Sequence, residues 1–414
     1  MVSYSLFKNT FLFSFILIAA CGNSTRTKVE NQKSKDIPQV HTSTVTQKKE
    51  IKTGAENYSA YLPLLKNKNV GIVTNQTGTI NNEGKLTHIV DFLAAQDVNL
   101  KKIYAPEHGF RGTADAGELI KDGKDTKTGL PIVSLYGNNK KPKPDQLAGI
   151  DIMVFDLQDV GARFYTYISS LHYVMEACAE NNIEVMVLDR PNPNGGIVDG
   201  PVLETENSSF VGMHPIPVLH GMTIGEYAKM INGEKWLKGE IQCKLTVIPC
   251  LNYKRNMDYS LPVKPSPNLP NDKAINLYPS LCFFEGTNVS VGRGTNMQFQ
   301  IYGSPYLPNN GFSFTPQPNE GAKDPMYHGK KCYGEDLTNT AKVYKLDLKW
   351  LIEAYNNTED RSKFFIHFFT KLAGTKKLQE QIEKGMSEAE IRKSWLNGLE
   401  NFKQMRRQYL VYDE

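Results

Sequence analysis

Carboxylate side chains stand at the ends of several short apolar runs in this chain, in places where they could do acid–base chemistry. Glu107 follows the apolar run at residues 100–105. Asp156 ends the run at residues 151–156. Cleavage of a glycosidic bond needs two carboxyl groups, one that protonates the leaving oxygen and one that acts as base or nucleophile. The pattern fits glycoside hydrolysis, although phosphatases and amidohydrolases also gather Asp, Glu and His.

Glu107 is the first candidate for a catalytic group. His108 and Gly109 follow it directly, and Gly112 comes soon after. A glycine-rich turn behind a buried strand lets the backbone approach a ligand closely, and it aims the carboxylate into a cleft. We therefore predict a catalytic role for Glu107, with His108 either taking part in catalysis or only orienting Glu107.

The second catalytic carboxylate is predicted from the segment behind residue 155. Asp159 ranks ahead of Asp156, because it precedes a Val-Gly turn from which its side chain can project. The distance between the two carboxyl groups would then decide the stereochemistry, with about 5–5.5 Å for retention and about 6.5–9.5 Å for inversion. A structural role is the alternative, since aspartates here could cap helices or pair with Arg163 and Arg190.

Other polar and aromatic side chains follow the same apolar runs or lie in a glycine-rich segment near residue 290. Such side chains suit a carbohydrate-binding cleft, and an arginine between two glycines can clamp a carboxylate with both of its nitrogens. The predicted substrate-binding residues are Asn75, Arg111, Gln158, Arg163, Tyr165, Tyr167, Asp189, Arg190, His220, Glu285, Asn288 and Arg293. For the segment around Arg293, a structural hairpin is the alternative. Thr223 and Glu226 have the spacing of a helix-capping box.

The apolar runs themselves predict the fold that positions these residues. Continuous β-branched runs are typical of parallel strands that are covered on both faces. They occur at residues 70–75, 100–105, 131–136, 151–156 and 184–189. Helical patterns at residues 87–95 and 170–180 alternate with them. This alternation predicts a Rossmann-like, doubly wound α/β domain at residues 54–264, in which ligands bind at the carboxyl ends of the strands.

A change of composition marks a second domain. From residue 265 the chain is first rich in proline, then loop-like, and finally helical at residues 350–355, 363–372 and 387–397. Ser387 and Glu390 have capping-box spacing at the start of the last helix. We predict a smaller α+β domain at residues 265–414.

The N-terminal residues predict export and a lipid anchor. An apolar run of about ten residues, 11–20, is too short to span a membrane and suits a signal peptide. It ends in Ala-Ala-Cys, which matches the bacterial lipobox, with Cys21 as the lipidated residue. We therefore predict a signal peptide at residues 1–20 and a flexible tether at 21–53. A lipid-anchored protein of the periplasm, outer membrane or cell surface would result. An ordinary secretory signal is the alternative.

Composition and motif searches bear on the partners. The chain has 48 basic and 44 acidic residues, for a net charge of +4, and its basic residues are dispersed, so we predict no nucleic-acid partner. No glycine fingerprint follows a strand and no P-loop is present, which disfavours a nucleotide cofactor. Without a CxxC motif, a zinc site is not expected, and the five cysteines beyond Cys21 are predicted to be small core residues.

Several long motifs resemble the NamZ-type exo-β-N-acetylmuramidases. They are residues 107–112 (EHGFRG), 156–167 (DLQDVGARFYTY), 189–193 (DRPNP) and 284–288 (FEGTN). The resemblance runs from about residue 54 to the C-terminal segment. It implies a Rossmann-like domain joined to a smaller C-terminal domain, with the active site in the cleft between them. It also implies release of N-acetylmuramic acid from the non-reducing end of peptidoglycan fragments without stem peptides. Glu107 matches the family's catalytic glutamate, and no cofactor is expected.

The expected sugar has a lactyl group that ends in a carboxylate, which sets it apart from N-acetylglucosamine. Arg293, Arg163 and Arg190 are the candidates for recognising it, because an unpaired guanidinium would penalise a ligand without that group. Two alternatives stay open at this point. One is a non-catalytic lipoprotein that binds muropeptides. The other is a metal-dependent hydrolase that uses His108, His220, Asp156 and Asp189.

Overall fold

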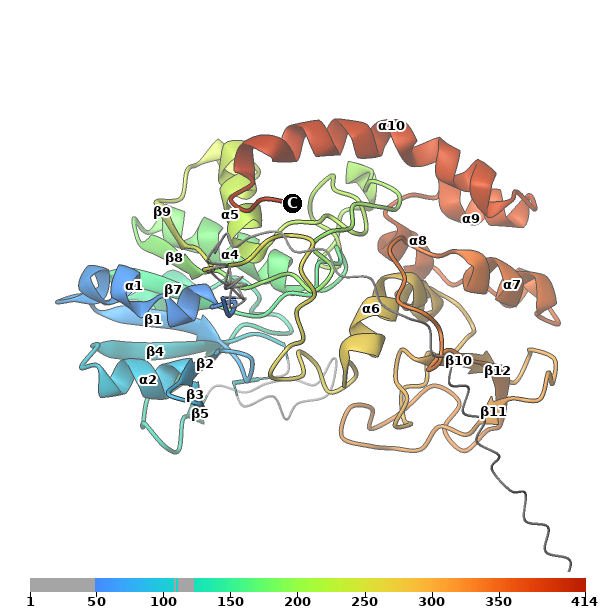
Figure 1. The fold of residues 1–414 in the computed structure, drawn as a ribbon, viewed down its shortest axis with the longest axis horizontal. Coiled ribbons are helices and arrows are strands. Elements are labelled where there is room, and N and C mark those ends of the chain that lie inside the picture. The colour runs from blue at the N-terminus through green and yellow to red at the C-terminus, as the bar shows by residue number, and fades with distance from the viewer. Residues whose placement is uncertain (1–48, 108, 111–122) are drawn as a thin grey trace, which may run out of the picture. The chain divides into compact units, whose positions relative to one another are not determined.

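A seven-stranded sheet forms the centre of the N-terminal domain, in the order β5-β6-β4-β1-β7-β8-β9 (Figure 1). The strands are β1 (Val70–Thr74), β4 (Leu100–Ala105), β5 (Gly123–Lys124), β6 (Pro131–Ser134), β7 (Ile152–Asp156), β8 (Glu184–Leu188) and β9 (Leu245–Ile248). All neighbours are parallel except β5 and β6. Without β5, the six parallel strands have the order 3-2-1-4-5-6 along the chain, which is that of a Rossmann fold. The order therefore reverses between β1 and β7.

The computed structural model describes residues 49–107, 109–110 and 123–414. The compact unit begins at Lys49, so residues 49–53, which were predicted to end the tether, belong to it. Lys52 pairs with Leu251, and Thr53 caps a 3-10 helix at Gly54–Glu56. Cys21, His108 and Arg111 lie outside the described residues.

The sheet is covered on both faces, as continuous apolar strands require. On one face, Ile72 and Val154 pack with α1 (Tyr58–Leu65) and α2 (Ile89–Ala95). On the other face, Val73 and Phe155 pack with α4 (Tyr167–Glu180) and α5 (Ile224–Gly233). Alternate residues of each strand therefore enter different cores. The predicted doubly wound α/β fold is confirmed.

The five predicted strands are all present, but several elements of this domain were not predicted, among them α1, β5 and α3 (Pro144–Leu147). A hairpin of β2 (Thr79–Asn82) and β3 (Lys85–His88) occupies the first residues of the helix predicted at 87–95, which begins only at Ile89. Its two turn residues, Glu83 and Gly84, both have positive φ, as a tight hairpin turn needs. A further missed element is β9, a short and partly exposed edge strand.

The C-terminal part combines a three-stranded antiparallel sheet with helices. Its elements are α6 (Asp272–Leu281), β10 (Ile301–Ser304), β11 (Ser313–Phe314), β12 (Cys332–Asp336), α7 (Lys349–Asn357), α8 (Phe368–Ala373), α9 (Lys377–Glu383) and α10 (Glu388–Arg406). The predicted helix at 363–372 is shorter than expected, because only α8 is α-helical there. The predicted capping box of Ser387 and Glu390 is confirmed at the start of α10.

The last residues of the chain return to the N-terminal domain. In Figure 1, α10 spans the molecule from α9 to α5. Beyond it, the backbone N–H of Val411 donates to Glu226 at 2.7 Å, and the hydroxyl of Tyr412 donates to Asp189 at 2.6 Å. The C-terminal segment therefore completes the polar core beside β8.

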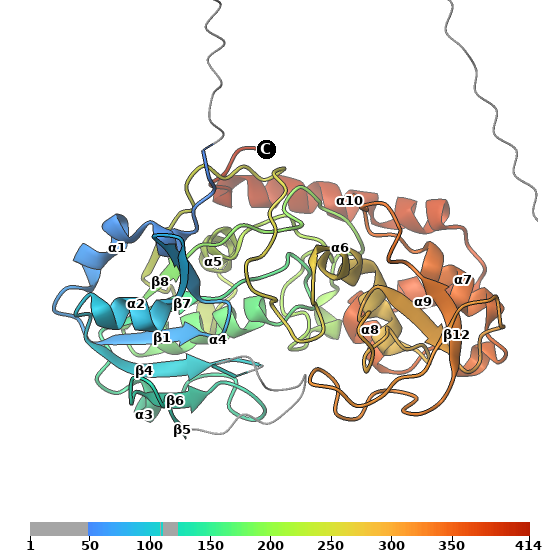
Figure 2. The same ribbon diagram turned by 60° about the horizontal axis from the view of Figure 1, so that its bottom comes forward.

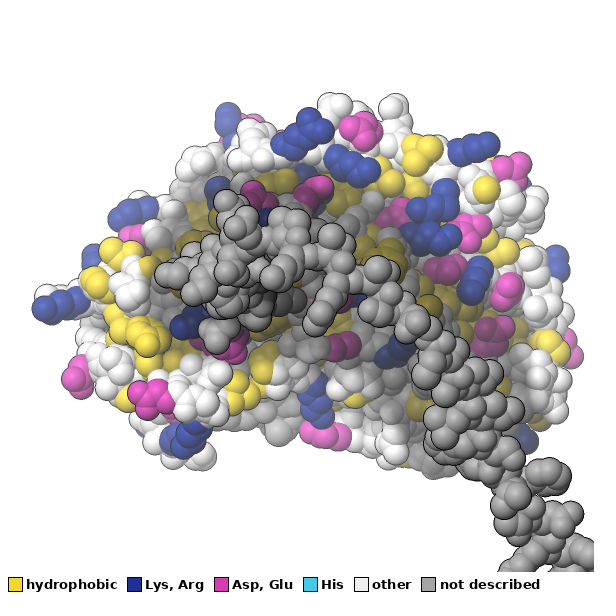
Figure 3. All heavy atoms as spheres, viewed as in Figure 1, with side chains coloured by type: hydrophobic (Ala, Val, Ile, Leu, Met, Phe, Trp, Pro, Cys, Tyr) yellow, Lys and Arg dark blue, Asp and Glu magenta, His cyan; other side chains and the backbone are white. Residues whose placement is uncertain are grey.

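Three further features concern the surface and the core. The five cysteines that the structure describes are free and buried, which confirms their prediction as core residues. Charges of both signs are interspersed over the face in Figure 3. Within the described ranges, no helix combines the length and the apolar character needed to cross a membrane.

Candidate active site

A cavity of about 210 Å³ lies where the carboxyl ends of the strands face the C-terminal part of the chain. Figure 2 shows β1 and β4 running toward that part. From the N-terminal domain, the cavity is lined by Glu107, Tyr136, Lys140, Phe164, Tyr165, Thr166, Tyr167, Phe210 and Val211. From beyond residue 264, it is lined by Ser266, Asn268, Leu269, Tyr278, Glu285, Arg293 and Phe299. The cavity is therefore built from both parts of the chain, at the edge where a Rossmann-like sheet binds ligands.

Glu107 lines this cavity and is held there by two hydroxyl groups. The hydroxyl of Thr166 donates to one carboxylate oxygen at 3.0 Å, and the hydroxyl of Tyr136 donates to the other at 3.4 Å. Thr166 stands at the start of α4, behind β7, and Tyr136 follows β6. The segments that follow β6 and β7 thus supply donors that fix the orientation of a carboxylate presented behind β4.

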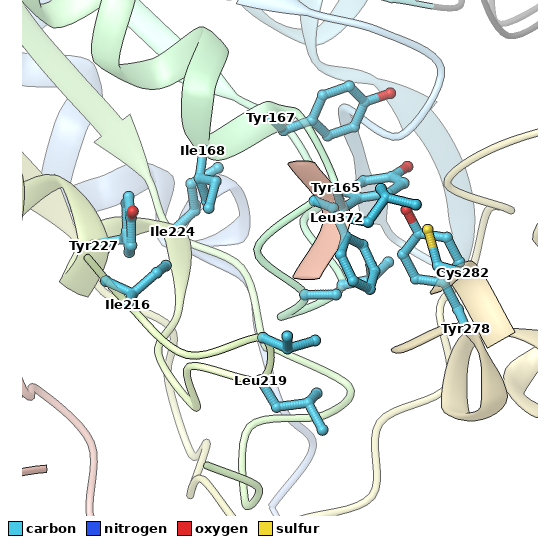
Figure 4. Close-up of a cluster of buried hydrophobic side chains, with 14 of the residues drawn as sticks. Tyr165, Tyr167, Ile168, Ile216, Leu219, Ile224, Tyr227, Tyr278, Cys282 and Leu372 are labelled. Carbon is cyan, nitrogen blue, oxygen red and sulfur yellow. The ribbon is translucent and has the colours of Figure 1, made fainter. Parts of the chain in front are cut away.

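Tyr165 and Tyr167 form the aromatic wall of the cavity. Tyr165 lies between Tyr167 and Tyr278, with ring centroids 4.9 and 5.9 Å away (Figure 4). Burial, and then the neighbouring Tyr167, raise the pKa of Tyr165 well above its usual value. Burial, followed by the charge of Glu107, also raises the pKa of Tyr167. Both hydroxyls therefore stay protonated at neutral pH.

Asn75 supports this wall from behind. Its side-chain nitrogen donates to the hydroxyl of Tyr167 at 2.5 Å, and its side-chain oxygen accepts a bond from the hydroxyl of Thr77 at 2.6 Å. Asn75 is completely buried and does not line the cavity. The structure thus gives it a positioning role, in place of the substrate contact that was predicted.

Glu285 faces the cavity from the C-terminal part, together with Arg293. The guanidinium Nε of Arg293 donates to Glu285 at 2.6 Å, and the group lies 5.2 Å from the ring centroid of Phe299. Gly292 and Gly294 on either side have positive φ, and a Cβ at Gly294 would lie only 2.7 Å from the carbonyl oxygen of Gln317. The two glycines therefore permit the turn that brings the guanidinium to Glu285.

Asp156 and Arg190 form a buried ion pair away from the cavity lining. Arg190 donates to the two oxygens of Asp156 at 2.6 and 3.0 Å, and a further bond goes to the carbonyl oxygen of Thr79. The side chains are 0% and 1% exposed, respectively. Neither residue lines the cavity, and the pair ties the end of β7 to the start of β2. The geometry favours the structural alternative over the predicted roles in catalysis and substrate binding.

Asp189 also has a structural environment. It accepts bonds from the backbone of Gly225, at the start of α5, and from the hydroxyls of Thr223 and Tyr412 at 2.7 and 2.6 Å. Burial raises its pKa to about 6, against the effect of the hydroxyl donors. Asp189 joins β8, α5 and the C-terminal segment, and it does not line the cavity. The predicted capping box of Thr223 and Glu226 is confirmed beside it.

Asp159 and His220 face each other in the core beneath the tyrosine wall. The His220 Nε2 lies 3.8 Å from an Asp159 oxygen, and that oxygen accepts a bond from Gly161 at 2.7 Å. Burial raises the pKa of Asp159 to about 7, and burial together with the charge of Arg406 lowers the pKa of His220 to about 3. Both residues are buried, and neither lines the cavity. Asp159, which was predicted to be catalytic, therefore lies behind the cavity wall.

Gln158 and Arg163 are likewise directed into the structure. Gln158 donates to the carbonyl oxygens of Asp159 and Pro191. Arg163 donates to four backbone carbonyls, two of them in the N-terminal domain and two at Leu372 and Ala373, all at 2.8 Å. Burial lowers its pKa to about 9. Arg163 thus joins the two parts of the chain, and its terminal nitrogens are not free for a substrate carboxylate.

Asn288 completes the set of predicted site residues that the structure describes. Its backbone N–H donates to the carbonyl oxygen of Phe364, and its backbone carbonyl oxygen accepts a bond from the hydroxyl of Tyr327 at 2.7 Å. It does not line the cavity. Of the predicted residues, the structure brings together Glu107, Tyr165, Tyr167, Glu285 and Arg293 in one cavity. Within the described ranges, no three His, Cys, Asp or Glu side chains come together as metal ligands.

Comparisons with known proteins cover both parts of the chain. The family model "Exo-beta-N-acetylmuramidase NamZ, N-terminal" matches residues 70–273, and the corresponding C-terminal model matches residues 276–412. The chain belongs to the NamZ family. The resemblance predicted from the motifs is confirmed.

Individual NamZ relatives match over most of their lengths. The peptidoglycan β-N-acetylmuramidase NamZ of Bacillus subtilis is 40% identical over 393 residues, which is 88% of this chain and 92% of the relative. A crystal structure of a DUF1343 family protein from Bacteroides fragilis is 45% identical, with a TM-score of 0.81, and covers 88% of this chain and 100% of its own. A second such protein from the same organism is 30% identical, with a TM-score of 0.74, and covers 88% and 99%. These matches support the two-domain α/β architecture.

Several cavity residues of this NamZ-family chain were missed in the sequence, including three polar ones that follow β6 and β7. Tyr136 and Lys140 follow β6, and Thr166 stands within the motif that contains Tyr165 and Tyr167. The strand at 131–136 was predicted, and the rule that ligands bind behind parallel strands applies to it as well. Applied to this strand, the rule would have indicated Tyr136 and Lys140.

Proposed function

We propose that this protein is an exo-β-N-acetylmuramidase that releases N-acetylmuramic acid from the non-reducing end of peptidoglycan fragments without stem peptides. The observation that carries the proposal is the family match over both domains, combined with the position of Glu107. The motif resemblance implies that Glu107 is the catalytic glutamate, and Glu107 lines a cavity built from the two domains. The half-buried carboxylate of Glu107, beside an aromatic wall, suits a site that binds the terminal sugar of a glycan chain.

Within this proposal, Glu107 protonates the leaving oxygen of the glycosidic bond. Thr166 and Tyr136 hold its carboxyl group in the cavity. The second carboxylate is Glu285, because Asp156, Asp159 and Asp189 do not line the cavity. Arg293 fixes the orientation of Glu285 through the 2.6 Å bond, as a base or nucleophile in this cavity requires.

The direct test is an assay for free N-acetylmuramic acid. Peptide-free glycan strands with a terminal N-acetylmuramic acid are incubated with the protein, with and without a chelator, and the products are identified by mass spectrometry. The proposal predicts release of the terminal N-acetylmuramic acid in both conditions. Binding without release would indicate a muropeptide-binding protein, and release only without chelator would indicate a metal-dependent hydrolase.

We further propose that the mature protein is anchored by lipid at Cys21 and acts in the periplasm or at the outer membrane. The support is the lipobox-like sequence at residues 18–21 behind a short apolar run. In cells that make the protein, the wild type should enter the detergent phase on Triton partitioning, and Cys21→Ser should enter the aqueous phase. Equal partitioning of the two would contradict the anchor.

A further inference from the structure

Among the residues that the structure describes, two cationic side chains line the cavity, Lys140 and Arg293, and they differ in how they are paired. Arg293 is bound to Glu285 at 2.6 Å and lies over the ring of Phe299. The charge of Glu285 already balances that of Arg293, and it would repel a substrate carboxylate placed beside the same guanidinium. Arg293 is therefore the less available of the two cations for an anionic ligand.

Lys140 makes no ion pair with any carboxylate that the structure describes, and its ammonium nitrogen lies 4.3 Å from the ring centroid of Phe210. A cation–π contact uses the charge of the ammonium group but none of its three hydrogen-bond donors. The neighbouring Lys141 is different, because it is paired with Glu176 and Glu180, both at 2.7 Å. Only the first of these adjacent lysines keeps its donors for a ligand.

The position of Lys140 is fixed by its surroundings. The side-chain amide of Asn139 donates to the carbonyl oxygen of Ser134 at 2.7 Å, which ties the segment to the end of β6. Phe210 in turn stacks on Tyr173 of α4, with an interplanar angle of 12°. The same segment carries Tyr136, whose hydroxyl binds Glu107. An anion bound at Lys140 would therefore lie in the cavity that contains the proposed catalytic acid.

We propose that Lys140 binds the lactyl carboxylate of N-acetylmuramic acid and is the residue that selects this sugar over N-acetylglucosamine. The inference rests on the proposed function, because the lactyl group is the only anionic group of the expected terminal sugar. It also explains a preference for peptide-free substrates. A stem peptide converts the lactyl carboxylate into a neutral amide, which cannot form an ion pair. A reaction that hydrolyses this amide must therefore supply the substrate.

The test compares two synthetic β-N-acetylmuramides with the same chromogenic leaving group, one with a free lactyl carboxylate and one with a lactyl carboxamide. The wild type should prefer the carboxylate. Lys140→Gln should lower kcat/KM for the carboxylate by about 10-fold or more, mainly through KM, because a charged hydrogen bond is lost. The same variant should leave the carboxamide nearly unaffected. Lys140→Arg should retain most of the preference, and the matched control Lys141→Gln should retain all of it.

The failures of the two proposals are distinguishable. If the wild type releases no N-acetylmuramic acid from either compound or from glycan strands, the proposed function is wrong. If the wild type prefers the carboxylate and Lys140→Gln keeps that preference, only the role of Lys140 is wrong. Loss of the preference in Arg293→Gln with no change in Lys140→Gln would assign it to Arg293 and contradict the inference. Thermal melting of each variant verifies that it is folded. If Lys140→Gln does not fold, Lys140→Arg still allows the test.

Discussion

The carboxylates that were predicted for the site fall into two groups, and these differ in what surrounds them. Asp156 and Asp189 are completely buried, and they are bound by a guanidinium, backbone N–H groups and hydroxyls. Glu107 and Glu285 are half-buried and line a cavity. A place behind a parallel strand thus puts an acid near the ligand-binding edge, but the direction of the side chain decides whether it meets ligand or core.

The reason for the difference lies in the partners, which come from distant parts of the chain. Asp189 is bound by Tyr412, and Arg163 by Leu372 and Ala373. Each of these contacts joins residues about 200 positions apart. Local patterns therefore indicate which residues lie near the edge of the sheet, but they do not show which of them are already satisfied by the fold.

The largest expected effect concerns the buried group. Arg190→Met should lower the free energy of unfolding by about 3–5 kcal/mol, because it leaves the charge of Asp156 buried without a partner. Denaturant unfolding measures this loss. The double variant Asp156→Asn/Arg190→Met should recover part of it, since no charge is then left alone. Activity per folded molecule should stay near that of the wild type in both. A large loss of kcat with unchanged stability would place this pair in the active site.

Glu285→Gln should change the free energy of unfolding less than Arg190→Met does. Its main effect should be a loss of catalytic activity. If Glu285 is the second carboxylate, kcat should fall at least about 10-fold, as loss of a base does. The melting temperature should hardly change, because the pair with Arg293 is about one-quarter exposed and such pairs contribute little to stability. Glu388→Gln is the matched control, since Glu388 is also a partly exposed glutamate, paired with Lys345 at 3.0 Å. Equal activity of both variants would leave Glu285 without a catalytic role.

The smallest effect on activity is expected at Asp159, where the change should instead appear in how stability depends on pH. Because burial raises its pKa from 3.8 to about 7, the folded protein keeps a proton there that the unfolded chain loses near pH 4. This contribution to stability is fully present below about pH 4 and is lost as the pH rises to about 7. Asp159→Asn has no such titration. Its stability relative to the wild type should therefore increase between these pH values, by up to about 4 kcal/mol, and then level off.

The titration of His220 changes stability with pH in the opposite direction, so the wild type has to be compared with Asp159→Asn at each pH. Its pKa is lowered to about 3, so its contribution to stability increases as the pH rises from about 3 to its usual value of 6.5. Because His220 is present in both proteins, the difference between wild type and Asp159→Asn isolates the carboxyl group. A difference in unfolding free energy that is constant from pH 4 to pH 8 would show that Asp159 is not destabilised by its burial.

Much of the fold was predictable from the sequence, because buried parallel strands are continuous apolar runs and helix caps have local signals. All five predicted strands and the capping box at Ser387 are present. The hairpin of β2 and β3 was not predicted, since its turn is Glu-Gly and its strands are partly exposed. In the site, Glu107 and Arg293 were found through motifs. Lys140 has no motif, and only its place behind β6 indicates it.

The central claim is that the cavity glutamate does the chemistry and that the buried aspartates build the scaffold. It is tested most directly by measuring kcat for release of N-acetylmuramic acid with Glu107→Gln and Asp159→Asn at one pH, together with their melting curves. We predict that Glu107→Gln lowers kcat by at least about 10²-fold with an unchanged melting temperature. Asp159→Asn should keep kcat within a few-fold of the wild type. A loss in Asp159→Asn as large as that in Glu107→Gln, or near-normal turnover in Glu107→Gln, would contradict the claim.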